Sequence, residues 1–197
     1  MLELPPGTAL LSTSHAAPAA VSRAEKWEGG LSFEDFLPTA QKNVDLWPAL
    51  YRRATVPPEV LARAAALPGR WHLLTLSADW CGDAVNTVPV LARLVEATPN
   101  LALRVLDRDE HLDLMDEHLT GGTARAIPAV LVLDEGFIER GWWGPRPSVL
   151  QTWFKTVGQA MDKPERYRRI RQWYARDQGR STLEEVVALL ERAAGLP

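Results

Sequence analysis

The sequence predicts an α/β fold in which a central four-stranded mixed sheet is flanked by helices. Between residues 71 and 161, apolar runs and helical periodicities follow one another in the order strand, helix, strand, helix, strand, strand, helix. Two strands joined through a helix are almost always parallel, whereas the turn at residues 134–136 predicts an antiparallel hairpin between the last two strands. A lone cysteine, Cys81, falls at the junction between the first strand and the first helix.

The expected strands are short and mostly apolar, which is typical of strands buried on both faces of a sheet. They span residues 71–76, 101–106, 128–133 and 137–142. The helices that connect and follow them carry apolar residues at steps of three and four. These helices are expected at residues 82–97, 109–119 and 148–161.

Helical segments extend this core at both ends. Apolar residues recur at helical spacing between residues 32 and 54, and a shorter helix follows up to a Pro-Gly turn. After the core, a helix is expected at residues 163–176, and Ser181 with Glu184 forms a capping-box pattern that begins the last helix. The chain is therefore divided into a flexible tail (1–30), an N-terminal helical arm (31–69), a core (70–161) and a C-terminal helical extension (162–197).

Composition narrows the classes of function. A hydrophobic content of 46% supports an ordinary buried core, and the net charge of −3 gives no overall attraction to nucleic acid or to an anionic membrane. A basic stretch at residues 163–180 is expected to pair and pack within the protein instead of binding nucleic acid. A single cysteine excludes an internal disulfide and fits a reducing cytoplasm, and no spacing of residues predicts a metal or another cofactor.

The position of Cys81 at the start of a helix favours its thiolate, because the helix dipole contributes about 0.3–1 kcal/mol there. Asp83, two residues on, opposes this by about 1 kcal/mol in a watery setting. We therefore expect a thiol whose pKa is only modestly perturbed. The alternative that remains open is a buried, inert cysteine.

Three stretches together resemble the thioredoxin superfamily: Ser-Ala-Asp-Trp-Cys-Gly-Asp-Ala at residues 77–84, Pro89 within the following helix, and Ala-Ile-Pro at residues 126–128. The Gly-Asp pair and the helical extensions are similar to a bacterial branch with a Trp-Cys-Gly-Asp-Cys motif. The resemblance implies a thioredoxin fold, an attacking thiol at Cys81 and a cis proline, Pro128, opposite it. It also implies substrate contacts by Trp80, Gly82, Asp83, Ile127, Pro128 and Trp143, and Arg146 is a candidate for binding an acidic group of a small thiol.

The sequence departs from this family at two positions. Ala84 occupies the place of the second, resolving cysteine, so this chain cannot complete a dithiol cycle by itself. Thr75 occupies the place where thioredoxins often carry a buried aspartate, and threonine cannot act as that base. Two origins remain open for Ala84: a natural monothiol protein, or an alanine introduced in place of cysteine.

The leading hypothesis is a cytoplasmic, monothiol thioredoxin-like protein that forms mixed disulfides with a protein or low-molecular-weight substrate and needs an external thiol for release. It predicts no nucleic-acid or membrane partner. The alternative hypothesis is a thioredoxin-fold binding or interaction module without turnover, because a fold does not imply catalysis. A third hypothesis, coordination of an iron–sulfur cluster between two chains, rests on the thiol count alone.

Overall fold

A computed structural model describes residues 21–196 and contains one four-stranded sheet in the order β2-β1-β3-β4. The strands are β1 (Trp71–Ser77), β2 (Leu101–Asp107), β3 (Ala129–Leu133) and β4 (Glu139–Trp143). β1 runs parallel to β2 and antiparallel to β3, and β3 runs antiparallel to β4. The predicted mixed sheet and its order of elements are therefore confirmed, with strand ends within about two residues of those expected.

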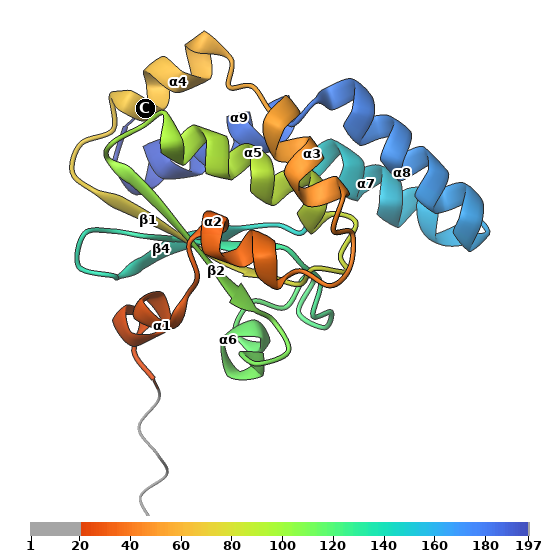
Figure 1. Ribbon diagram of the computed structural model, residues 1–197, viewed down its shortest axis with the longest axis horizontal. Helices are drawn as coiled ribbons and strands as arrows, with labels where there is room; N and C mark the ends of the chain where they lie inside the picture. The colour runs from red at the N-terminus through yellow and green to blue at the C-terminus, as the bar shows by residue number, and fades with distance from the viewer. Residues whose placement is uncertain (1–20, 197) are drawn as a thin grey trace, which may run out of the picture.

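One face of the sheet is covered by α5 (Ala84–Glu96) and α9 (Arg180–Ala193), as Figure 1 shows. A second tier lies against these helices, with α3 (Leu46–Arg53) on α5 and α4 (Pro58–Ala65) on α9. The apolar stripe of α9 joins the same core as the strands. This stripe consists of Leu183, Val186, Val187 and Leu190, all fully buried. The N-terminal arm and the last helix are therefore part of the packed core.

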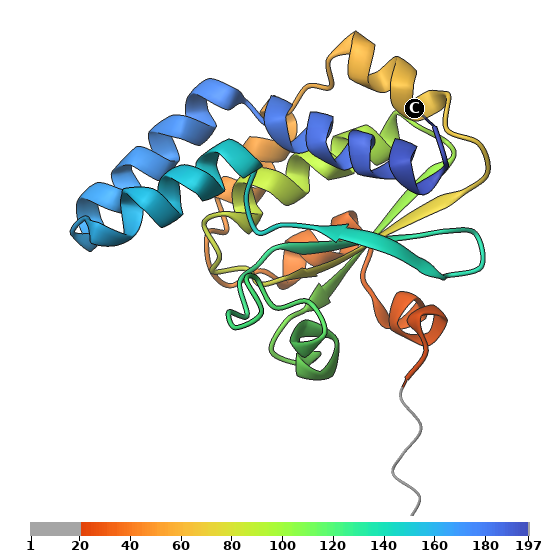
Figure 2. The same ribbon diagram turned by 180° about the vertical axis from the view of Figure 1, so that it is seen from behind.

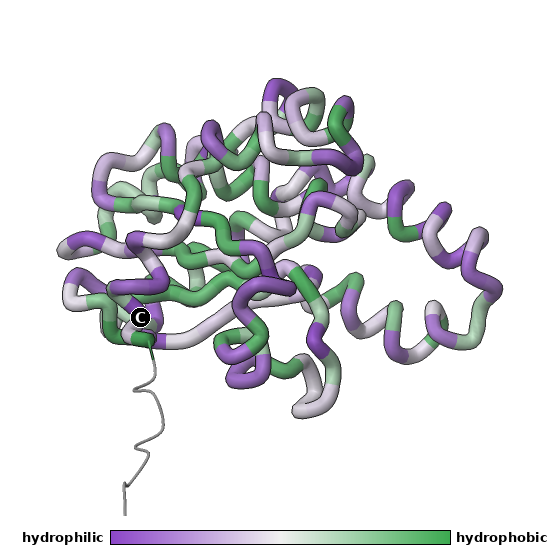
Figure 3. The backbone as a smooth tube through the Cα atoms, turned by 60° about the horizontal axis from the view of Figure 1, so that its bottom comes forward, coloured by the Kyte–Doolittle hydropathy of each residue, from purple (hydrophilic) through white to green (hydrophobic). Residues whose placement is uncertain are grey.

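Two helices between β4 and α9 form a hairpin that projects from the body of the molecule (Figures 2 and 3). They are α7 (Ser148–Thr156) and α8 (Lys163–Asp177), joined through a 3-10 turn (Gly158–Ala160). Their buried side chains, Leu150, Ile170 and Tyr174, form a small cluster separate from the main core.

The helix predicted at residues 148–161, within the predicted core (70–161), lies in this hairpin as α7. In contrast, α9, which falls in the predicted C-terminal extension (162–197), packs on the strands. The physical reason is that α9 presents the more continuous apolar stripe, which buries more area against the strands. The hairpin is thus an insertion before the final helix of the core.

The opposite side of the sheet carries α1 (Arg23–Gly29) and α6 (Leu112–Asp116), below the strands in Figures 1 and 2. A capping box begins α1, since the Ser22 side chain accepts from the Glu25 N–H while the Glu25 carboxylate accepts from the Ser22 N–H. The predicted flexible tail is therefore wrong over residues 21–30, and its remainder, residues 1–20, lies outside the described residues. Within residues 21–196, no helix combines the length and apolarity needed to cross a bilayer.

The helix expected from residue 32 to residue 54 is divided into α2 (Phe33–Phe36), a 3-10 turn (Leu37–Thr39) and α3. Pro38 cannot donate a helical hydrogen bond, and Asn43 adopts a left-handed backbone with φ of 52° before α3 begins. The break folds α2 back, so that Phe36 packs edge-on against Trp47 with ring centroids 4.9 Å apart.

Two predicted helix boundaries also differ. The helix expected at residues 109–119 is shortened to the five residues of α6. The capping box predicted at Ser181 does not form, because Gly179 takes the N-cap position with φ of 84° and Ser181 donates to Asp177. Glu184 pairs instead with Arg180.

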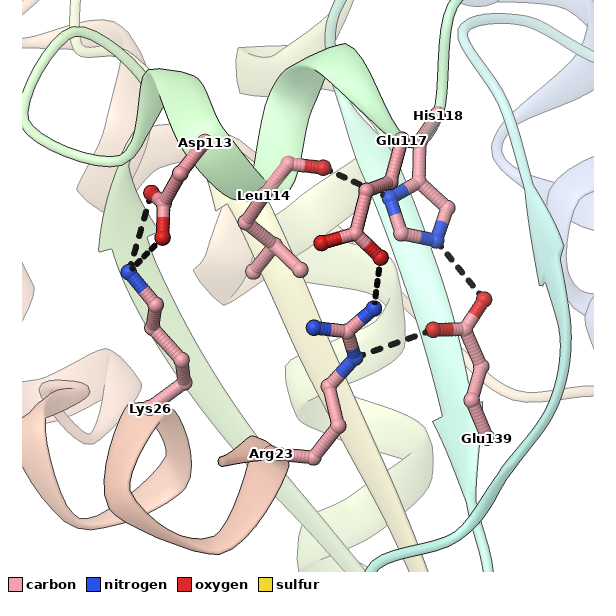
Figure 4. Close-up of polar contacts among 7 residues, drawn as sticks. All are labelled: Arg23, Lys26, Asp113, Leu114, Glu117, His118 and Glu139. Atoms are coloured by element: carbon pink, nitrogen blue, oxygen red, sulfur yellow. Dashed lines mark hydrogen bonds and ion pairs between the residues drawn. The ribbon is translucent and has the colours of Figure 1, made fainter. Parts of the chain in front are cut away.

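A buried charged cluster ties α1, α6 and β4 together (Figure 4). His118 is 2% exposed, and its ring nitrogens lie 2.7 Å from the Leu114 carbonyl oxygen and 2.7 Å from Glu139 Oε1. Both partners only accept hydrogen bonds, so both ring nitrogens carry a proton. Burial alone would lower the pKa of His118, but the hydrogen bonds to Glu139 and Leu114 outweigh it and raise the pKa. Arg23 donates to the other oxygen of Glu139 and links α1 to this pair.

We expect the free energy of unfolding to fall as pH rises through the folded-state pKa of His118. Because that pKa is raised above the unfolded value of about 6.5, the contribution is complete at acidic pH and lost at alkaline pH. In urea unfolding from pH 6 to pH 9, the advantage of the wild type over His118→Gln should shrink by about 1–2 kcal/mol.

His111→Gln is the matched control on the neighbouring segment. Burial and Lys26 lower the pKa of His111, so its protonation opposes folding and its removal should change the pH slope in the opposite direction. An advantage of the wild type over His118→Gln that stays constant from pH 6 to pH 9 would contradict a protonated His118.

Candidate functional site

Cys81 lies in the short connection between the end of β1 and the start of α5. Its N–H donates to the Ala78 carbonyl, which closes a tight turn, and the first N–H of α5, on Ala84, points at its sulfur from 3.4 Å. The thiol donates to the Ile127 carbonyl oxygen at 3.3 Å. The chain therefore fixes the sulfur from two sides, and 7% of the residue remains exposed.

The segment opposite the sulfur is held by a close backbone approach. The Ile127–Pro128 peptide bond is cis, and the Pro128 carbonyl packs against Gly144 at the end of β4. A Cβ atom on Gly144 would lie 2.1 Å from the Pro128 oxygen, and its φ of 138° also favours glycine. Glycine at position 144 therefore lets the end of β4 approach the Pro128 carbonyl, one residue beyond the Ile127 carbonyl that accepts from the thiol.

Asp83 lies in a buried ion pair directly beside the cysteine turn. Arg146 Nη2 is 2.6 Å from its Oδ2, and the Tyr174 hydroxyl donates to its Oδ1 at 3.0 Å. One donor on each oxygen is the arrangement of an ionised carboxylate. Burial raises the pKa of Asp83, while Arg146 and Tyr174 oppose that rise. Burial and the nearby carboxylate raise the pKa of Tyr174 well above its ordinary value.

The Cys81 thiol is more strongly perturbed than the sequence predicts. Burial, and to a smaller extent the Asp83 carboxylate, raise its pKa to about 11, although the backbone N–H groups and Arg146 oppose the rise. The expectation of a modest shift is wrong because it placed both groups in water, whereas both are buried. At neutral pH the thiol is therefore almost entirely protonated.

A cleft of about 570 Å³ opens over the cysteine. Of the predicted site residues, six line it: Trp80, Cys81, Gly82, Asp83, Ile127 and Arg146. Trp80 is 49% exposed, and the Arg108 guanidinium lies 5.0 Å from the centre of its ring. Pro128 is buried behind Ile127 and does not line the cleft.

Trp143 is placed elsewhere, so its predicted role in the groove is wrong. Its side chain is buried toward α9, where the indole N–H donates to Glu185 at 2.7 Å. The same carboxylate accepts from the N–H and hydroxyl of Ser148, which begins α7. Trp143 therefore serves core packing instead of substrate contact.

Sequence reasoning missed the contribution of α8. Lys163, Tyr167, Ile170 and Arg171 line the cleft, and Tyr174 reaches Asp83 from the same helix. Their spacing of three and four residues places them on one face of the helix. That pattern is visible in the sequence and could have indicated that this face turns toward the site. The prediction that the basic stretch at residues 163–180 pairs within the protein holds for Arg169, which lies 2.7 Å from Glu165, but it overlooks the residues that face the cleft.

Residues from other loops complete the lining. Arg108 and Arg125 flank the segment of α6, and Asn43 and Leu46 come from the start of α3. Thr75 is fully buried on β1, and its hydroxyl has no hydrogen-bond partner among the described residues. No group of three or more His, Cys, Asp or Glu side chains in residues 21–196 is arranged to hold a metal ion.

Comparisons with known proteins give a family and a fold. A family model described as thioredoxin matches residues 30–171. The crystal structure of an HIV epitope scaffold is similar with a TM-score of 0.70 and 22% identity, covering 87% of this chain and 98% of that chain. A protein of unknown function from Pseudomonas aeruginosa is similar with a TM-score of 0.70 and 24% identity, covering 88% and 99%. No curated protein matches the sequence. The predicted thioredoxin-like α/β fold is thus confirmed.

The charge at Asp83 is expected to control the reactivity of Cys81. Asp83→Asn removes the negative charge and leaves Arg146 as an uncompensated cation, and both changes favour the thiolate. The rate of iodoacetamide alkylation at pH 8 should rise about three- to tenfold, with its midpoint moved below pH 11. Glu28→Gln, which changes an exposed carboxylate on α1, is the control of equal charge change and should leave the rate unchanged. An unchanged rate in Asp83→Asn would contradict the electrostatic coupling.

Proposed function

The chain belongs to the thioredoxin family, and from that premise we propose that it acts in thiol–disulfide exchange through Cys81. The single observation that carries this proposal is the placement of the only cysteine in the floor of a cleft, beside an N–H of α5 and the Ile127 carbonyl. A substrate sulfur entering the cleft meets a thiol held in one orientation, with few rotamers to lose.

The proposed step begins with loss of the Cys81 proton to a base in solution. Both oxygens of Asp83 are engaged by Arg146 and Tyr174, so this carboxylate is not a free proton acceptor. The thiolate then attacks one sulfur of a substrate disulfide. A new bond forms between Cys81 and that sulfur, the substrate S–S bond breaks, and the other half leaves as a thiolate. No net oxidation or reduction is required.

Release of the mixed disulfide needs a second thiol from outside the chain. Position 84 carries only a methyl group, and Cys81 is the one cysteine in the sequence. An external thiolate attacks the mixed disulfide, regenerates the Cys81 thiolate and departs as a disulfide with the substrate half. We place this cycle in the cytoplasm, where small thiols are abundant and thiols stay reduced.

A second candidate, a binding module without turnover, is favoured by one observation. The raised pKa of Cys81, about 11, keeps the thiol in its less reactive form at neutral pH. In that case the cleft would hold a ligand and the thiol would only help to line it.

Formation of an adduct separates the two candidates. The wild type incubated with excess 2-hydroxyethyl disulfide at pH 8 should gain one mixed disulfide at Cys81, detected by intact-mass spectrometry and reversed by dithiothreitol. Cys81→Ser is the control and should gain none. The absence of an adduct after hours of incubation would contradict the exchange mechanism and favour the binding module without turnover.

Restoring a second thiol should convert the chain into a dithiol enzyme. The Ala84 N–H lies 3.4 Å from the Cys81 sulfur, so a sulfur on residue 84 would be brought close to it. Ala84→Cys is expected to lose both free thiols on oxidation and to reduce insulin with dithiothreitol at least about tenfold faster than the wild type. Ala84→Ser is the control of matched size. A variant that folds but keeps two free thiols after oxidation would show that the site cannot support resolution.

A further inference from the structure

The cleft over Cys81 is enclosed by parts of the chain outside the strands. Tyr167 and Ile170 of α8 form one wall, while Asn43 and Leu46 close the side toward α3. The remaining wall is the segment that leads to Ile127. A volume of about 570 Å³ lies in the range of sites that bind small molecules. The projecting hairpin therefore gives the site the dimensions of a pocket.

The charges around this pocket are strongly biased. Five lining residues are cationic, Arg108, Arg125, Arg146, Lys163 and Arg171, and one is acidic, Asp83. The chain as a whole has a net charge of −3, so the pocket has the opposite sign to the molecule. Cationic residues gathered in one concave site attract anions and hold them by charge-assisted hydrogen bonds.

The cations differ in how far they are already neutralised. Arg146 is paired with Asp83, Arg125 with Asp116 and Arg108 with Asp109. Lys163 and Arg171 make no ion pair within the described part of the chain. Arg168 and Arg169, on the same helix but outside the lining, both pair with Glu165. Lys163 and Arg171 are thus cations of α8 that line the pocket without an ion-pair partner among the described residues, whereas Arg166 and Arg176, which also make no ion pair there, lie outside the lining.

The cations also lie on two sides of the cysteine. Lys163 and Arg171 belong to α8, whereas Arg108 and Arg125 flank the segment of α6. Figures 1 and 2 place α8 and α6 on opposite sides of the sheet. A ligand whose disulfide meets Cys81 would therefore direct anionic groups at both ends toward cations.

We propose that this pocket selects low-molecular-weight disulfides that carry anionic groups on both halves. The inference rests on the proposed exchange at Cys81 and adds the substrate class. The thiolate of Cys81 bonds to one sulfur of the ligand, the S–S bond of the ligand breaks, and the second half leaves as an anionic thiolate. Carboxylates and phosphates present the same chemistry to the arginine and lysine side chains.

The test compares disulfides of different charge with the full chain, by the rate of adduct formation at pH 8. Oxidised glutathione supplies carboxylates, coenzyme A disulfide supplies phosphates, 2-hydroxyethyl disulfide is neutral and cystamine is cationic. Each rate is divided by the rate of the same disulfide with a free peptide thiol, which removes differences in intrinsic reactivity. After this correction, we expect at least one anionic disulfide to react about tenfold faster than the neutral one in 20 mM NaCl. The preference should shrink in 500 mM NaCl. The two anionic reagents distinguish a carboxylate from a phosphate ligand.

The double variant Lys163→Gln with Arg171→Gln should reduce the rate of adduct formation with the preferred anionic disulfide about fivefold or more. Its rate with the neutral disulfide should remain unchanged. Both side chains are exposed, so the fold should be retained. Arg168→Gln with Arg169→Gln is the matched control on the same helix and should preserve the preference. Insulin, a folded protein disulfide, should react more slowly than the small anionic reagent.

The outcomes separate this inference from the function on which it rests. Two results would overturn the proposed substrate class and leave the exchange mechanism intact. In the first, Cys81 forms an adduct with the neutral disulfide and reacts no faster with the anionic disulfides. In the second, insulin reacts faster than every small disulfide. A preference that survives the double variant at full strength would also overturn it. No adduct with any reagent would overturn both proposals.

Discussion

The buried ion pair between Asp83 and Arg146 is the interaction on which the site depends. It joins the start of α5 to the segment after β4, and Tyr174 extends it to α8 through the second carboxylate oxygen. An unpaired buried carboxylate is costly, so the projecting hairpin cannot leave this position without exposing or isolating the charge. The same contact that anchors the hairpin therefore defines one wall of the cleft and the electrostatic setting of the thiol.

This dependence also explains which parts of the molecule could be predicted. The strands, the cysteine at the junction of β1 and α5, and the mixed sheet follow from local apolar runs and short-range connections. The burial of Asp83 does not, because its partner Tyr174 lies 91 residues away. An exposed Cys81 and a buried Cys81 look the same in the sequence, and so do an exposed and a buried Asp83 two residues on. Burial of the thiol, with the buried carboxylate adding to it, raises the pKa of Cys81 to about 11.

The different placement of α7 and α9 has a similar origin. Both helices are amphipathic, so their sequences alone do not decide which of them covers the sheet. The choice is made by fit: Leu183 and Leu190 of α9 are fully buried in the main core, whereas Leu150 of α7 is buried against α8. The placement of Trp143 also depends on a distant contact, because its indole N–H donates to Glu185 on α9. Non-local packing of this kind is what periodicity cannot decide.

The raised pKa of the Cys81 thiol gives a physical reason for the cleft that surrounds it. Relative to its ordinary value of 9.0, a pKa of about 11 lowers the thiolate fraction at neutral pH about 100-fold. The more basic thiolate is intrinsically about six- to tenfold more nucleophilic, so the net loss in rate is about 10- to 16-fold. A site this slow is useful only if binding raises the local concentration of its substrate, and well-oriented binding can exceed that loss by orders of magnitude. In the proposed exchange, the basic pocket and the weakly ionised thiol are therefore complementary. Binding in the pocket would supply what the thiol lacks in reactivity, and it would confine the proposed exchange to molecules that the pocket holds.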